Sequence, residues 1–315
     1  MKKKLIGMLA LCVILCLCVT GCFGGKEEPQ GESTITPLLY RVTDEGGNVI
    51  WLFGSIHVGV ESYYPLPDYV LDAFDGSDAL AVELDVMKLE WNFVEQTELL
   101  QLMVYTDGTD ITDHLPEATY TRAVEILQEN GMYKEGMEYY IPAFWWSTVE
   151  SLTYGASGAQ TTLGIDRHLL KRARSDGKPV LEIESGEFQY GMMANFSPEL
   201  QQLLLESAIA SYDDPDATLE ELNIMMELWA TGDEEAFAAY LGAETEITNP
   251  EEEVLYREYT EALITSRNQS MTEYAVDALA SGEEIFICVG AAHIVGQGAM
   301  AENLRQLGYQ VELMK

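Results

Sequence analysis

The sequence predicts an α/β domain over residues 38–315 that carries a mainly helical insertion at about residues 87–278. Apolar, β-prone runs near both ends of the chain predict strands, and helical periodicity fills most of the chain between them. Strands at both ends with long helical stretches between them are typical of an α/β domain with an insertion. The expected strands cover residues 38–42, 49–53, 79–84, 179–183, 285–289 and 309–313.

Turn and capping residues separate these elements. The first two strands flank Asp44-Glu45-Gly46-Gly47-Asn48, a turn-forming stretch that predicts a β-hairpin. Asp166 is expected to begin a helix as its N-cap residue rather than to act as a ligand. Further helices are expected over residues 67–74, over 198–278 with breaks at Gly232-Asp233 and Asn249-Pro250, and over 298–307.

The N-terminus has the layout of an export signal. Lys2, Lys3 and Lys4 precede an apolar run over residues 5–18, which is too short to span a bilayer. This arrangement predicts a signal peptide over residues 1–21. The stretch Val19-Thr20-Gly21-Cys22 resembles the lipobox of bacterial lipoproteins. We therefore expect lipidation at Cys22, a flexible linker over 22–37, and a chain exported and lipid-anchored at the outer side of the cell membrane. An ordinary secretory signal with an incidental cysteine is the alternative.

Charge and cysteine content narrow the classes of partner. The chain holds 53 acidic and 17 basic residues, and such an acidic surface repels nucleic acid and anionic lipid headgroups while attracting cations and basic peptides. Membrane association is therefore expected through the lipid anchor only.

Once the signal peptide is removed and Cys22 is lipidated, Cys288 is the remaining cysteine, so no disulfide forms within one chain. Cys288 is interpreted as a buried strand residue rather than a nucleophile.

Two histidines occur in the same local pattern. Residues 51–59 and 288–296 each read as an apolar strand, then Gly-x-x-His, then small and apolar residues. A glycine at the carboxyl end of a strand allows a sharp turn and a close approach of backbone to a ligand. His57 and His293 are then expected to point into the crevice beyond the strand ends, where open α/β sheets place their sites. Two buried histidines bonded to backbone are the simpler interpretation.

Glu83 stands at the end of the third strand, where an unpaired buried carboxylate would be costly. Two neutral imidazoles and one carboxylate form a familiar ligand set for a catalytic divalent metal. His57, Glu83 and His293 are therefore candidate metal ligands. A set of this kind does not choose between Mn²⁺, Co²⁺ and Zn²⁺. Alternatively, Glu83 pairs with a nearby arginine or caps a helix.

A series of short motifs resembles a known family, the TraB/GumN family, which includes the Tiki proteins. The resemblance covers roughly residues 38–314. Single motifs in the series are weak, whereas their order is specific. They are residues 52–57, Leu66-Pro67, residues 82–85, Gly164-Ile165-Asp166, Glu184-Ser185 with Gln189, Trp229 with Gly232-Asp233, Arg267-Asn268 with Met271, residues 290–293 and Gly308-Tyr309.

The resemblance implies a fold like that of erythromycin esterases and haem-binding ChaN proteins: a central mixed β-sheet with flanking helices and a large helical insertion. For the Tiki branch it also implies a divalent-metal-dependent protease that uses both histidines and the glutamate. By this resemblance Arg267 and Asn268 would stabilise an oxyanion and hold substrate, and Glu184 would be a general base or would support a metal ligand. The backbone at the two Gly-x-x-His loops would contact substrate, at Gly54, Ser55, Gly290 and Ala291.

The sequence thus predicts a surface-anchored, metal-dependent hydrolase that acts on peptide bonds of secreted or surface proteins. Two other classes stay open. One is a metal-free hydrolase with one histidine as general base and Glu83 orienting it. The other is a non-catalytic binder of secreted peptides. The sequence does not define the oligomeric state.

Three weaker candidates remain. His168 is expected to be solvated, and His114 has no evident partner. The aromatic residues within 139–146 are expected to pack in the core or between domains.

Overall fold

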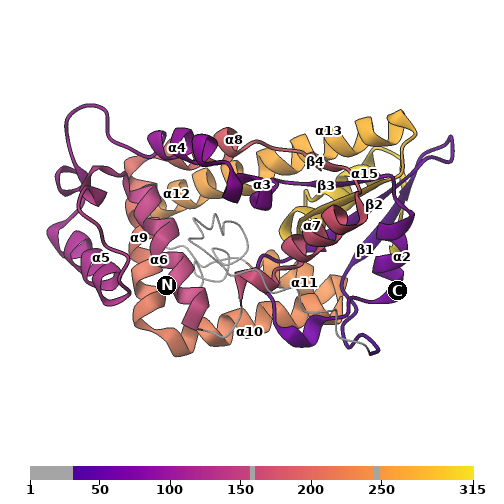
Figure 1. Cartoon of the computed structure of the whole chain (residues 1–315), viewed down its shortest axis with the longest axis horizontal. Helices are drawn as coiled ribbons and strands as arrows, with labels where there is room; N and C mark the ends of the chain where they lie inside the picture. The colour runs from indigo at the N-terminus through magenta and orange to yellow at the C-terminus, as the bar shows by residue number, and fades with distance from the viewer. Residues whose placement is uncertain (1–30, 157–159, 244–248) are drawn as a thin grey trace.

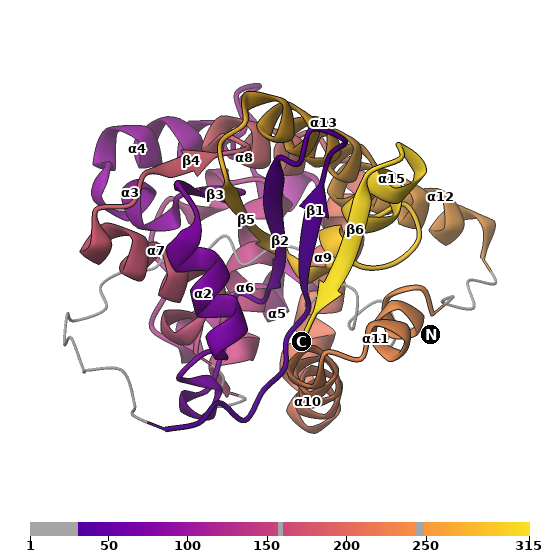
Figure 2. The ribbon, with the colours of Figure 1, turned by 90° about the vertical axis from the view of Figure 1, so that its right-hand side faces the viewer.

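A mixed sheet with the strand order β4-β3-β5-β2-β1-β6 occupies one end of the molecule (Figures 1 and 2). Strands β4, β3, β5 and β2 run parallel to one another, whereas β1 is antiparallel to both β2 and β6. The structure is a computed structural model, and it describes residues 31–156, 160–243 and 249–315. The strands are β1 (Leu39–Thr43), β2 (Val49–Ser55), β3 (Ala79–Val82), β4 (Val180–Glu182), β5 (Ile285–Gly290) and β6 (Gln310–Met314).

The mixed α/β fold class predicted from the sequence is confirmed. Every expected strand is present, with small shifts at its ends. β1 and β2 form the expected hairpin, in which Asp44 accepts a hydrogen bond from the backbone N–H of Asn48 at 2.8 Å. Gly47 lies in the left-handed region with φ 86°, which a turn of this kind needs and which glycine adopts without strain.

Helices make up most of the remaining described chain. The α-helices are α2 (Asp68–Gly76), α3 (Val86–Trp91), α4 (Phe93–Gln101), α5 (Glu117–Glu129), α6 (Pro142–Ala156), α7 (Ile165–Asp176), α8 (Gly186–Ala194), α9 (Pro198–Asp213), α10 (Pro215–Thr231), α11 (Glu234–Leu241), α12 (Pro250–Thr260), α13 (Ser266–Ser281), α14 (Ala291–Ile294) and α15 (Met300–Gln306). Four short 3₁₀ turns are η1 (Glu61–Tyr63), η2 (Ile111–Asp113), η3 (Met137–Tyr139) and η4 (Thr161–Leu163), and the π-helical turn η5 spans Glu261–Thr265.

Both expected breaks in the second helical region are confirmed. Gly232 ends α10 with φ 59°, and the side chain of Asp233 caps α11. Asn249 caps α12 in the same way. The sequence interpretation missed one break, at Asp214, whose side chain caps α10 with Pro215 in the first turn. Proline suits that position because its missing N–H would have no partner within the helix.

The helices separate into a group on the sheet and a group away from it. Helix α7 packs against β3 and β4, and α13 packs against β2 and α15. At the opposite end of the view in Figure 1 lie α5, α6 and α9, and α6 packs along α9. Trp145 and Trp146 on α6 are fully buried, as the packing interpretation of the aromatic cluster predicts, whereas Tyr139 is exposed.

The expected signal peptide and the lipidation site Cys22 lie outside the described residues. Ordered packing begins slightly before residue 38. Ile35 is buried, Thr36 donates its backbone N–H to Ala230 O at 2.7 Å, and Tyr69 donates its hydroxyl to Pro37 O. The end of the expected linker is therefore part of the packed domain. In the described ranges, no helix combines the length and the apolar character needed to cross a bilayer.

Candidate functional site

The carboxyl ends of four neighbouring parallel strands bring most of the candidate residues to one edge of the sheet. β2 and β5 are hydrogen-bonded neighbours whose last residues, Ser55 and Gly290, are in register. β3 lies on the other side of β5, and β4 lies beside β3. Open α/β sheets hold their sites at such an edge. The candidates that follow β2, β3, β4 and β5 are His57, Glu83, Glu184 and His293.

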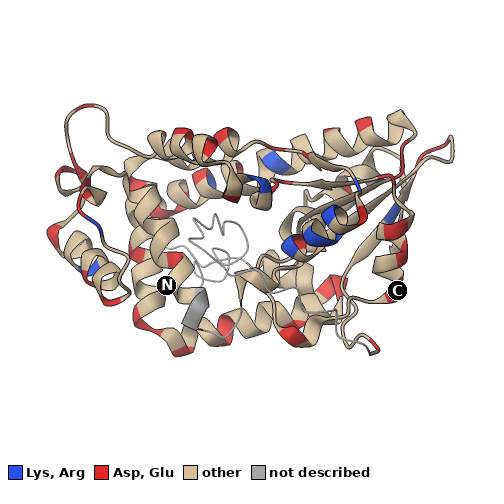
Figure 3. Ribbon diagram, viewed as in Figure 1, with Lys and Arg blue, Asp and Glu red and all other residues tan. Residues whose placement is uncertain are grey.

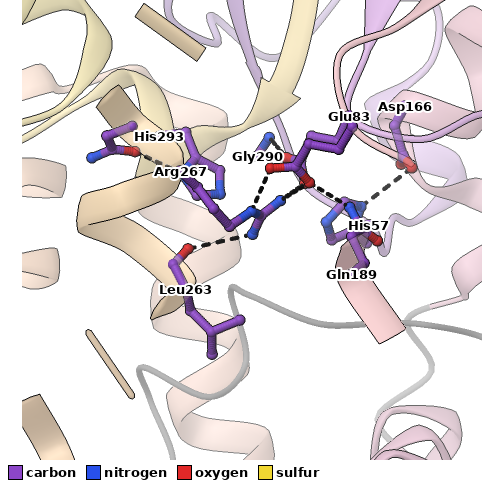
Figure 4. Close-up of polar contacts among 10 residues, drawn as sticks. His57, Glu83, Asp166, Gln189, Leu263, Arg267, Gly290 and His293 are labelled. Carbon is purple, nitrogen blue, oxygen red and sulfur yellow. Dashed lines mark hydrogen bonds and ion pairs between the residues drawn. The ribbon is translucent and has the colours of Figure 1, made fainter. Parts of the chain in front are cut away.

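Arg267 pairs with both carboxylates at this edge, and Figure 4 shows it beside Glu83. Its Nη2 donates to Glu83 Oε2 at 2.5 Å and to Glu184 Oε2 at 2.8 Å, and its Nε donates to Glu184 Oε1 at 2.7 Å. Arg267 comes from the first turn of α13, immediately after the π-helical turn, and its Nη1 donates to Leu263 O within that turn. The guanidinium is 2% exposed, so the ion pairs are nearly dry and strong.

Glu83 is held as an anion from two sides. Its Oε1 accepts the backbone N–H of Gly290 at 2.6 Å, while Oε2 pairs with Arg267. Burial alone would raise the pKa of Glu83, but the charge of Arg267, the charges of the two histidines when they are protonated, and the hydrogen bond from Gly290 outweigh burial and lower it. Pairing with an arginine was the simpler of the two interpretations of this residue, and the structure shows that pair.

Asn268 fixes the orientation of His293. The Nδ2 group of Asn268 donates to Gly298 O at 3.0 Å, so its Oδ1 faces His293 Nδ1 at 2.7 Å and accepts from it. The proton of the neutral imidazole is therefore on Nδ1 and the lone pair on Nε2. Burial, reinforced by the charge of Arg267, lowers the pKa of His293 to about 3, so this side chain is neutral at physiological pH.

Asp166 plays the corresponding part for His57. Its Oδ2 lies 3.2 Å from His57 Nδ1. The N-cap of α7 is Gly164, not Asp166, so the expectation of a helix cap was wrong: Asp166 stands within the first turn and its carboxylate is turned to the histidine. A side chain on Gly164 would place its Cβ 2.5 Å from His57 O, and glycine therefore permits this close approach. The sequence indicated Asp166 as a helix cap and as part of the Gly164-Ile165-Asp166 motif, but not as a partner of His57.

The charges around His57 favour its protonated form. Burial lowers the pKa of His57, but the charge and the hydrogen bond of Asp166, with the charge of Glu83, outweigh it and raise the pKa to about 9. The two histidines therefore differ at neutral pH: His57 is an imidazolium and His293 is neutral. A metal ion at His57 would have to displace a proton.

These opposite shifts predict a stability maximum near pH 6.5. The raised pKa of His57 stabilises the fold fully below pH 6.5, and that contribution, at most about 3 kcal/mol, is lost between pH 6.5 and 9. The lowered pKa of His293 works the other way, so stability falls as the pH drops from 6.5 toward 3. Urea unfolding across this range measures both limbs. His57→Gln is expected to flatten the alkaline limb alone, and an unchanged alkaline limb in that variant would contradict the assignment.

The remaining substrate-binding candidates are closely packed. A Cβ on Gly54 would lie 3.0 Å from the Cα of Ala291, so the first Gly-x-x-His loop contacts the second one at Gly54. Gly54 O accepts the indole N–H of Trp229 at 2.8 Å, and Ser55 is buried. Close contact between the loops is therefore a sufficient reason for the glycine at position 54.

Three other predictions concern side chains outside the set of candidate site residues. Cys288 is buried in β5 as predicted, and burial raises the pKa of its thiol. His168 was expected to be solvated, but its ring lies 4.4 Å from that of Tyr64, and burial lowers its pKa to about 4; that expectation was wrong. His114, for which no partner was evident, stacks on Tyr105 at 4.4 Å.

The candidate ligand side chains meet some, but not all, of the requirements of a divalent metal site. Both histidines have Nδ1 bonded to a side-chain oxygen and Nε2 left for a ligand, which is how proteins usually orient metal-bound imidazoles. Glu83 fits less well, because its carboxylate is shared between Arg267 and Gly290. Within the three described ranges, no three His, Cys, Asp or Glu side chains are gathered closely enough to hold an ion. Binding would therefore require Glu83 to turn partly away from Arg267.

Comparisons with known proteins cover nearly the whole described domain. A family model described as the TraB/PrgY/gumN family matches residues 38–313. A protein described as "Uncharacterized protein YbaP" from Escherichia coli (strain K12) is 26% identical over 265 residues, which is 84% of this chain and 90% of that protein. The protein of the same description from Shigella flexneri matches to the same extent. No solved structure matches significantly.

Proposed function

Because this chain belongs to the TraB/PrgY/gumN family, we propose that it is a metal-dependent hydrolase of peptide bonds whose site is the sheet edge holding His57, Glu83 and His293. One observation carries the proposal. Each histidine lies just beyond the end of one of two neighbouring strands, and each has its Nδ1 fixed by a side-chain oxygen and its Nε2 left for a ligand. Two imidazoles oriented in this way beside a carboxylate are the donors of a catalytic metal centre.

His57 and His293 would hold the ion, with Glu83 as the third ligand. When bound, a divalent ion such as Mn²⁺, Co²⁺ or Zn²⁺ acidifies a water molecule and polarises a carbonyl. The chain's own residues orient and charge the site. Asp166 and Asn268 fix the two rings, and Arg267 fixes the carboxylate of Glu83.

Arg267 and Glu184 are assigned supporting parts. Both oxygens of Glu184 accept from Arg267, and Glu184 Oε2 also accepts from Gln189 at 2.8 Å. A carboxylate held in this way suits a positioning residue better than a general base. Arg267 keeps positive charge beside Glu83, where it would stabilise an oxyanion once Glu83 turns toward the ion.

A metal-free hydrolase is the second candidate, and one contact favours it. Asp166 is bonded to His57 Nδ1 in the arrangement that orients a general-base histidine. The orienting carboxylate is therefore that of Asp166, whereas Glu83 pairs with Arg267 and Gly290. In this mechanism His57 Nε2 would take the proton of the attacking water, which requires the neutral imidazole, so the rate would rise as the pH approaches 9.

We also propose that the chain is exported and tethered by lipid on Cys22, as its N-terminal sequence indicates. A tethered chain would meet secreted or surface peptides rather than cytosolic ones. Radiolabelled palmitate incorporated by the parent but not by Cys22→Ala tests the tether independently of activity.

Chelator sensitivity tests the proposed activity. The full-length chain is expected to cleave members of a peptide library after supplementation with Mn²⁺, Co²⁺ or Zn²⁺, and a chelator is expected to abolish cleavage. His57→Ala and His293→Ala should each lower the rate by at least about a hundredfold, since a metal ligand acts on the chemical step itself. Chelator-resistant cleavage that needs His57 would support the metal-free mechanism. Peptide binding without turnover under every condition would leave only a binding protein.

A further inference from the structure

Exposed apolar side chains occur on the helices that follow the two carboxylates of the site in the chain. Helix α3 begins three residues after Glu83, and α8 begins two residues after Glu184. Trp91 ends α3, and it is followed at once by Phe93 and Val94 on α4. The exposed fractions are 64% for Trp91, 71% for Phe93, 69% for Val94 and 46% for Phe188 on α8.

Helices α3, α4 and α8 lie side by side in both views (Figures 1 and 2). α4 packs on the start of α8 at Gly186, where a Cβ would lie 2.7 Å from Leu99 Cδ1. Phe188 is the neighbour of Gln189, whose amide donates to Glu184 inside the site. We call Trp91, Phe93, Val94 and Phe188 the apolar patch. Its four side chains are exposed, and they lie on or beside the helices that follow Glu83 and Glu184 in the chain.

The charges around the apolar patch are negative. Glu98 on α4 and Glu187 on α8 are exposed, and in the described part of the chain no ion pair joins either to a basic side chain. The nearby bases are engaged: Lys88 pairs with Glu182, and Arg167 pairs with Glu90. Figure 3 shows the basic residues concentrated on α7 and acidic residues over most other helices. A partner here must therefore offer apolar surface together with positive charge.

We propose that the apolar patch is a docking surface for a peptide or protein segment that carries bulky apolar side chains and Lys or Arg. The inference rests on the proposed function for the use of the neighbouring site. A bilayer is the less suitable occupant, because acidic side chains beside the patch repel anionic headgroups. A basic, apolar segment satisfies both features of the surface, and two of the helices on which it would dock, α3 and α8, follow Glu83 and Glu184 closely in the chain.

Trp91 provides a direct probe. The other tryptophans are buried or half-buried. A change in the fluorescence of the solvent-exposed tryptophan therefore reports on the patch. The experiment uses the full-length chain in phosphatidylcholine nanodiscs, titrated with a peptide of alternating Lys and Leu or of alternating Glu and Leu. The Lys/Leu peptide is expected to shift the emission to shorter wavelength and to protect Trp91 from iodide. Trp91→Phe should lose both signals.

Matched variants distinguish binding at the apolar patch from non-specific electrostatic binding of a basic peptide to an acidic protein. Phe93→Ser/Val94→Ser is expected to weaken binding of labelled Lys/Leu peptide by at least about tenfold. Ile224→Ser/Val254→Ser, which removes exposed apolar side chains from α10 and α12, should leave binding unchanged. Equal binding by the patch variant would overturn the proposal, since the attraction would then be charge alone.

Three further outcomes bear on the proposal. Iodide protection of Trp91 in nanodiscs without peptide would identify the bilayer as the occupant and would overturn the proposal. Binding and turnover are read separately. Patch-dependent binding would support the docking surface even if this peptide is not cleaved, and it would count against the hydrolase only if the peptide library is also left uncleaved. Cleavage unaffected by the patch variant, with no patch-dependent binding, would refute the docking surface.

Discussion

Replacing Arg267 with Met is expected to destabilise the fold by about 3–5 kcal/mol. The substitution leaves the carboxylates of Glu83 and Glu184 at the sheet edge without the guanidinium that neutralises both, and these carboxylates are 11% and 6% exposed. Breaking a buried pair costs far more than the pair contributes, because an uncompensated charge remains in a poorly solvated place. Urea unfolding of the purified chain measures the loss, which is a large share of the stability of a typical domain.

A surface arginine provides the matched control. Arg172 pairs with Asp75 at 2.8 Å, but the carboxylate is half exposed, so Arg172→Met is expected to cost less than about 1 kcal/mol. Combining Arg267→Met with Glu83→Gln and Glu184→Gln should restore part of the lost stability, since the triple variant buries no unpaired charge. If Arg267→Met is as mild as Arg172→Met, the carboxylates are not held as the contacts indicate.

The second large effect is expected at Asp166. Asp166→Asn removes the negative charge bonded to His57 Nδ1 while keeping the side chain's shape. The pKa of His57 should then fall from about 9 toward its ordinary value, because the largest of the factors that raise it is the charge of Asp166. If the histidine binds a metal, affinity should drop by about 10–100-fold, as for other side chains that orient ligating histidines. NMR titration and metal-binding isotherms measure the two effects.

Asp176 is the control for this prediction. It lies in the last turn of the same helix, and its contact with Arg172 is at 3.7 Å on the surface. Asp176→Asn is expected to leave both the His57 titration and metal affinity unchanged. An Asp166→Asn protein with parental values in both assays would mean that Asp166 merely lies near His57 and does not orient it.

The sheet could be predicted from the sequence because its strands are short apolar runs with clear boundaries. The Gly-x-x-His pattern placed both histidines just beyond the ends of β2 and β5, since the spacing from the strand to the histidine is local. For Glu83 the sequence favoured a metal ligand and left pairing with an arginine as the alternative, because a carboxylate at a buried strand end needs a partner; the structure shows the arginine pair.

The contacts that complete the site could not be predicted from local sequence patterns. Asp166 lies 109 residues from His57, and Arg267 lies 184 residues from Glu83. Both pairs depend on where α7 and α13 pack against the sheet, and apolar periodicity does not fix that position. An aspartate after a glycine at a helix start also has an ordinary explanation as a cap, which here proved wrong. The π-helical turn before Arg267 has no signal in the sequence that distinguishes it from continuous helix.

Metal content tests most directly the claim that the two Gly-x-x-His loops form one centre. The full-length chain is purified after supplementation with Mn²⁺, Co²⁺ or Zn²⁺ and analysed by mass spectrometry beside His57→Ala, His293→Ala and the loop control His114→Ala. We expect about one ion per chain in the parent and in the control, and none in either site variant. A parent that stays free of metal, or site variants that keep it, would contradict the account.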